Sequence, residues 1–188
     1  MLLSSDSRTG LAAILAGVLI FAAQGGELAL GSEPTVLNVL WVSLGALGFA
    51  ALIVAIWGLG HLVSGRIGRI GWRISVAGVL FVGLFALQAL VTVALTGDIP
   101  GNFALFALGF LLLFVGHLVI APGLRGTLGR AWVLPLVGAA GILIAITLDV
   151  DPIHDIGLFV FEGAWVALGI ALLRAERQRQ PDTASVLV

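Results

Sequence analysis

Residues 16–21 read Ala-Gly-Val-Leu-Ile-Phe, and residues 46–49, thirty positions further on, read Ala-Leu-Gly-Phe. The same pair of stretches returns at 77–81 with 107–110 and, with small changes, at 140–144 with 167–170. Arg8, Arg69 and Arg130 precede the three pairs at intervals of 61 residues. Self-similarity at a fixed period is typical of a structural unit repeated along a chain. The sequence therefore predicts three tandem repeats, at about 8–68, 69–129 and 130–174.

The composition indicates an integral membrane protein. Apolar residues make up 60% of the chain, charged residues only 10%, and the mean hydropathy is +1.19. These values are far from those of a water-soluble domain. Cysteine is absent, which excludes disulfides and thiolate metal sites. Lysine is absent too, so a retinal-type Schiff base is excluded.

Each predicted repeat holds two apolar runs, and a transmembrane helix needs about 20 apolar residues. We therefore predict an all-α bundle of six transmembrane helices, built from three tandem hairpins. The hairpins share one orientation and should be related by a pseudo-threefold axis near the membrane normal. We expect one membrane domain over 1–174, a polar cytoplasmic tail over 175–188, and basic loops at 64–71 and 122–130. The predicted spans are about 11–30, 36–63, 72–96, 103–121, 131–148 and 156–173.

The arginines predict the orientation. All nine basic residues are arginines, and all fall on the side of the predicted bundle that holds both termini. The positive-inside rule makes that side cytoplasmic. Seven of the ten acidic residues fall on the opposite side. Because the composition is rich in Arg, Ala, Gly, Val and Leu, as in GC-rich prokaryotic genomes, the predicted location is the inner (cell) membrane of a prokaryote.

Some features recur at fixed places in the predicted hairpins. Tryptophan opens two odd-numbered spans, proline lies in each outer turn, and glycine lies midway along each even-numbered span: Trp72, Trp132, Pro34, Pro100, Pro152, Gly48, Gly109 and Gly169. In these features nearly the whole chain resembles the HdeD-like family. The resemblance implies a small six-span inner-membrane protein, associated in some bacteria with acid stress and without established chemistry. The first functional hypothesis is thus a non-enzymatic, stress-related membrane protein that acts through contacts with lipid, a partner protein or further copies of itself.

Polar side chains recur near the outer ends of the predicted spans. The repeated stretches at 16–21, 77–81 and 140–144 each begin with alanine. The residue eleven positions after that alanine is Glu27 in the first repeat, Gln88 in the second and Asp151 in the third. Glu162 lies inside the last predicted span, where an acid costs about 1–3 kcal/mol unless it faces protein or water. We therefore expect Glu162 to point into the bundle. The hypothesis is an outward-facing polar vestibule, lined by Glu27, Gln88, Asn102, Asp149, Asp151 and Glu162; the alternative is that these residues cap helix ends and bond to one another at the interface.

The vestibule supplies a second functional hypothesis, which is binding or acid catalysis on a small or isoprenoid-like molecule. Glu162 is the candidate acid, because a carboxyl group in apolar surroundings can hold a proton and donate it. The faces of Trp41 and Trp165 could shield a cationic intermediate. The first hypothesis predicts no catalytic residue and no cofactor.

A third hypothesis rests on two histidines. His61 and His117 lie in identical Gly-His-Leu-Val tetrapeptides near the cytoplasmic ends of two predicted spans, as a bis-histidine haem b would require. They are five residues out of register relative to Gly48 and Gly109, about 7.5 Å along a helix, which would put one of them in a loop; the alternative is a pair of interfacial histidines. His154 lies in an acidic outer turn with Asp149, Asp151 and Asp155, and we expect a solvated loop there and no metal site.

Other classes of chemistry lack their motifs. The sequence has no Gly-x-Ser-x-Gly elbow and no histidine pair at metalloprotease spacing, which argues against hydrolysis. The basic loop at 64–71 suits anionic lipid headgroups. It lacks the length and the interleaved aromatic residues of a nucleic-acid site, so the predicted partners are the bilayer and other membrane proteins, not nucleic acid.

Overall fold

The structure, a computed structural model, describes residues 4–31, 35–97, 103–147 and 153–179. Every regular element in these ranges is a helix, which confirms the all-α prediction. The elements are α1 (Ser5–Leu30), α2 (Thr35–Leu59), α3 (Arg66–Thr96), α4 (Ala104–Leu128), the 3₁₀ helix η1 (Gly129–Val133), α5 (Leu134–Thr147) and α6 (Ile153–Arg179).

Five helical segments of the described chain are long and apolar enough to cross a membrane, as expected for a multi-pass membrane protein. The sequence predicts six crossings. The difference lies in the fourth segment, Ala104–Thr147, whose 44 residues include α4, η1 and α5. A single straight helix of 44 residues would be about 66 Å long, at 1.5 Å per residue. Instead, α4 and α5 pack against each other, and η1 connects them in the chain. The crossing of the bilayer by both α4 and α5 stays a prediction.

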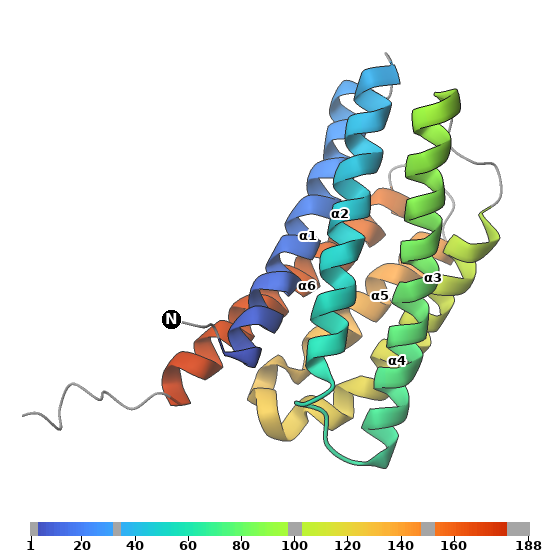
Figure 1. Cartoon of the computed structure of the whole chain (residues 1–188). Coiled ribbons are helices and arrows are strands. Elements are labelled where there is room, and N and C mark those ends of the chain that lie inside the picture. The colour runs from blue at the N-terminus through green and yellow to red at the C-terminus, as the bar shows by residue number, and fades with distance from the viewer. Residues whose placement is uncertain (1–3, 32–34, 98–102, 148–152, 180–188) are drawn as a thin grey trace, which may run out of the picture.

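The six α-helices form a ring. Each helix packs against the next one in the chain, and α6 packs back against α1 (Figure 1). Every predicted hairpin is therefore a packed pair of helices, and the pairs α2–α3, α4–α5 and α6–α1 join the hairpins together. The predicted internal repeat and its pseudo-threefold axis stay predictions.

Glycines hold several neighbouring helices at backbone contact. A Cβ atom at Gly109 of α4 would lie 2.8 Å from the Val82 nitrogen of α3, and one at Gly78 would lie 2.8 Å from the Gly109 oxygen. The same kind of contact joins α5 to α6, where a Cβ atom at Gly141 would lie 2.5 Å from the Gly157 oxygen. Small residues permit such approaches in lipid, where burial of apolar surface does not drive helices together.

Both described ends of the chain lie at one end of the bundle, which we call the arginine end (Figure 1). Ser4 and Ser7 donate hydrogen bonds to the Glu176 carboxylate, which joins the start of α1 to the end of α6. The Ser64 backbone N–H donates to the Gly123 oxygen, 2.9 Å away, and joins the α2–α3 connection to α4. The described arginines lie in the helix turns at this end: Arg8, Arg66, Arg69, Arg73, Arg125, Arg130, Arg174, Arg177 and Arg179.

Both predicted basic loops are largely helical, and this part of the prediction is wrong. α3 begins at Arg66, directly after Gly65, whose φ of 75° favours glycine. α4 continues through Pro122 to Leu128. Proline removes one hydrogen bond of the helix. The turn of α4 that follows Pro122 is nevertheless held by α3, because the Gly68 and Gly123 backbones are in contact. At the C-terminus, α6 continues to Arg179, five residues into the predicted polar tail.

The glycine contacts give the first testable prediction. Gly109→Ala should lower the free energy of unfolding by about 1–3 kcal/mol, because its methyl group must push α3 and α4 apart. Gly163→Ala is the matched control, since a Cβ atom there meets nothing within 4 Å, and it should leave stability unchanged or raise it. Reversible unfolding in mixed detergent micelles measures both. Equal effects would show that α3 and α4 do not depend on this contact.

Candidate functional site

A cavity of about 220 Å³ lies inside the ring, toward the end opposite the arginine end. Four helices enclose it. α1 contributes Ile20, Ala23, Gln24 and Glu27; α2 contributes Trp41, Val42, Gly45 and Phe49; α4 contributes Phe106 and Phe110; and α6 contributes Leu158, Phe161 and Glu162. We call this space the Glu162 cavity.

Glu162 is the one ionisable side chain of the cavity that lies deep in the protein. Its residue is 1% exposed, and neither carboxylate oxygen has a hydrogen-bond partner among the described residues. The fold fixes this position, because a Cβ atom at Gly17 of α1 would lie 2.6 Å from the Glu162 backbone oxygen. A buried carboxylate without partners is costly, typically by about 1–3 kcal/mol or more. The prediction that Glu162 points into the bundle is confirmed.

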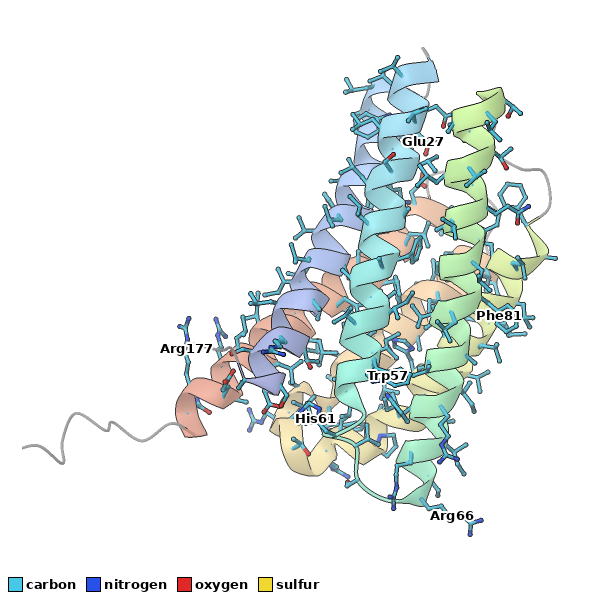
Figure 2. The ribbon with its side chains drawn as sticks, in the orientation of Figure 1. Glu27, Trp57, His61, Arg66, Phe81 and Arg177 are labelled. Atoms are coloured by element: carbon cyan, nitrogen blue, oxygen red, sulfur yellow. The ribbon has the colours of Figure 1, made fainter. Side chains whose placement is uncertain are left out.

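Gln24 and Glu27 connect the cavity to the protein surface. Gln24 Nε2 donates to Asp155 Oδ1, 3.0 Å away, while Gln24 Oε1 is buried and without a described partner. Glu27, one helical turn beyond, is exposed and also lines the cavity. Figure 2 shows Glu27 near the end of the bundle opposite to Arg66 and Arg177. The polar lining thus runs from a buried carboxyl group to the surface.

Aromatic rings form the apolar lining. Phe110 packs on Phe106 with ring centroids 4.5 Å apart, and on Phe49 and Phe161 at 6.4 and 5.9 Å. Trp41 lies over Gly26, where a Cβ atom would be 2.5 Å from its ring, and its indole N–H donates to the Gly31 oxygen at 2.9 Å. The cavity therefore combines fixed aromatic surfaces with one buried carboxyl group.

Two other predicted site residues that the structure describes, Gln88 and Trp165, do not line this cavity. Gln88 is exposed, because α3 turns Phe85, Ala86 and Ala89 inward and Gln88 falls on the outer side of the helix. Trp165 lies one turn beyond Glu162 but packs edge-on against His117, with centroids 5.4 Å apart, and lines different cavities. Asn102, Asp149 and Asp151 lie outside the described residues.

The two histidines of the haem hypothesis have different surroundings. His61 lies in the turn after α2, exposed, with Nε2 2.5 Å from Asp6 Oδ1. His117 is 3% exposed, and its Nδ1 donates to the Leu113 oxygen, 2.6 Å away, which leaves Nε2 without a described partner. The cavities beside His117 measure about 10 Å³ each. A haem does not fit there, so the described residues do not suit this cofactor.

His154 and Asp155, the described residues of the acidic outer turn, have structural roles. His154 Nδ1 donates to the Ala145 oxygen at 2.8 Å, and Asp155 accepts from Gln24. No group of three or more histidine, aspartate or glutamate side chains suited to a metal ion occurs within the described ranges. Two of the predicted acidic neighbours, Asp149 and Asp151, are again outside those ranges.

Sequence reasoning missed several residues near the site. The phenylalanines at 49, 106, 110 and 161 look like ordinary apolar residues of a membrane span, and no sequence signal sets them apart. Ser75 is also buried, and its hydroxyl has no described partner beside His117. Asn38 of α2, outside the site, donates from Nδ2 to the Gly97 oxygen at the end of α3, 2.9 Å away, and no sequence signal indicates this contact between helices.

The chain was also compared with known proteins. No family model, curated protein sequence or solved structure matches it. The HdeD-like resemblance therefore stays a prediction.

The burial of Glu162 gives the second testable prediction. Glu162→Leu should raise the free energy of unfolding by about 1–3 kcal/mol in the absence of ligand, because it replaces an unpaired buried carboxyl group with an apolar side chain. Glu27→Leu is the control at an exposed position and should change stability by less than about 0.5 kcal/mol. Unfolding in mixed micelles measures both. A loss of stability in Glu162→Leu would mean that the carboxyl group has a stabilising partner.

Proposed function

We propose that this protein binds a small, mostly apolar molecule with an amine or hydroxyl group in the Glu162 cavity. One observation carries the proposal: Glu162 lines the cavity, and both oxygens of its carboxyl group are buried without a hydrogen-bond partner among the described residues. Ionisable residues inside a membrane bundle are costly and tend to mark ligand or ion sites. A donor group on the ligand would supply the missing hydrogen bond.

The lining defines the class of ligand. A carboxyl group accepts hydrogen bonds in either protonation state, and a basic ligand can take up its proton, so a ligand with an N–H or O–H donor suits Glu162. The surrounding rings suit an aromatic or branched apolar body, and their faces attract a cation. A volume of about 220 Å³ is below the ~300–1,000 Å³ typical of sites for drug-sized molecules. A primary amine on a single aromatic ring fits these limits; a long isoprenoid would have to extend through the mouth at Glu27.

The proposal includes an orientation. The positive-inside rule places the arginine end in the cytoplasm, and the Glu162 cavity then opens toward the outer side of a prokaryotic cell membrane. Binding in this cavity is part of the second sequence hypothesis, and it shares with the first hypothesis only that no reaction is catalysed. No reaction is assigned, because the polar groups of the lining are Gln24, Glu27, Trp41 and Glu162, and none of the others is bonded to Glu162.

Gly45→Leu supplies the test, because it fills the cavity and leaves Glu162 in place. A Cβ atom at Gly45 meets only Ala23, at 3.9 Å, so the larger side chain extends into the cavity without displacing a helix. The probes are 2-phenylethylamine, 2-phenylethanol and phenylacetate, which share one apolar body. We expect the amine, and more weakly the alcohol, to raise the melting temperature of the wild-type protein. Phenylacetate should have no effect, and Gly45→Leu should abolish every shift.

Two results would overturn this proposal. Equal shifts with all three probes would indicate partitioning into the micelle and not recognition by a carboxyl group. A shift that persists in Gly45→Leu would place the binding site elsewhere in the protein. Gly163→Ala, with no neighbour at its Cβ position, is the control for the effect of substituting a glycine.

A further inference from the structure

A second and larger cavity lies at the arginine end, between the first turns of α1 and the last turns of α2. Its volume is about 460 Å³, which is within the ~300–1,000 Å³ range of sites that bind small molecules. One side of it is apolar, formed by Ile53, Val54 and Trp57 of α2. The other side is polar, formed by Ser5, Arg8 and His61. We call it the Arg8 cavity.

The cavity has a rigid apolar wall. A Cβ atom at Gly58 would lie 2.1 Å from Thr9 Oγ1, so α1 and α2 touch at its base. Trp57 is 63% exposed, and its ring packs edge-on against Trp72 with centroids 5.9 Å apart. Trp72 is itself fixed, because its indole N–H donates to the Ile56 oxygen at 2.8 Å. Figure 2 shows Trp57 beside His61 at the end of α2.

Arg8 supplies a positive charge at the polar side of the cavity. His61 Nε2 lies 2.5 Å from Asp6 Oδ1, so this imidazole is already engaged by a carboxylate. Arg8 is exposed and forms no ion pair with any described residue. A guanidinium group binds phosphate through two parallel hydrogen bonds. Ser5 adds a hydroxyl donor at the first turn of α1, where backbone N–H groups also favour an anion.

From these observations we propose that the Arg8 cavity binds one anionic phospholipid of the adjoining leaflet. The phosphate lies against Arg8 and Ser5, and an acyl chain lies along Ile53, Val54 and Trp57. A lipid fits better than a soluble phosphate compound, because the apolar wall is large and Val54 and Trp57 are exposed on the side where the bilayer would be. Tryptophan at the headgroup level of a membrane is the common arrangement.

Native mass spectrometry of the full-length protein tests the site. The protein is mixed with phosphatidylglycerol and phosphatidylcholine that carry the same acyl chains, and bound lipid is counted for each. We expect one tightly bound phosphatidylglycerol. Arg8→Gln should weaken it about fivefold, as expected for one arginine at an anionic surface. Arg69→Gln is the matched control, because it removes the same charge at the same end of the bundle but does not line the cavity.

Two further experiments distinguish a lipid in the cavity from a soluble phosphate compound. Val54→Trp should fill the apolar side and displace both lipids, while it changes an exposed residue and leaves the core intact. Glycerol 1-phosphate in excess should not compete, since it lacks acyl chains. Equal weakening by Arg8→Gln and Arg69→Gln would overturn the proposal, because it would show attraction to a charged surface without a site. Full competition by glycerol 1-phosphate would overturn it in favour of a soluble ligand.

Discussion

The close approach of helix backbones at glycine is the constraint on which the rest of this structure depends. Lipid offers no hydrophobic gain when two apolar helices associate, so the ring is held by contact geometry. At Gly48 a Cβ atom would lie 2.5 Å from the Ile20 side chain, and α1 and α2 therefore touch. One turn along, at Gly45, the nearest atom is Ala23 Cβ at 3.9 Å. The helices separate between these two glycines, and the Glu162 cavity lies where they separate.

The same contacts explain how Glu162 is held where solvation is poor. Gly17 brings α1 against the Glu162 backbone, and the rings of Phe161 and Phe110 line the same cavity as Glu162. An unpaired acid in such surroundings lowers stability, and the fold retains it nevertheless. A group that costs stability and faces a cavity is best explained by a ligand, which is why the proposed function rests on Glu162 and not on the more numerous polar residues near the helix ends.

The sequence predicted the features that depend on composition and periodicity. Long apolar runs are enough for an all-helical membrane protein, and the depth of Glu162 within a span was enough to place it inside the bundle. Helix boundaries at the arginine end were wrong, because Gly65 and Pro122 look like loop residues while tertiary contacts of Gly68 and Gly123 keep both segments helical. Gln88 was misplaced for a related reason: its equivalence to Glu27 came from position in a repeat, whereas its exposure depends on the rotation of α3 about its axis.

The central claim is that the Glu162 carboxyl group is the point of contact for a ligand. Infrared difference spectroscopy on protein with isotope-labelled glutamate reports that group directly when 2-phenylethylamine is added. The account predicts a change in a glutamate carboxyl band in the wild-type protein and no such change in Glu162→Gln. A spectrum that does not respond to the amine, or a response that persists in Glu162→Gln, would contradict it.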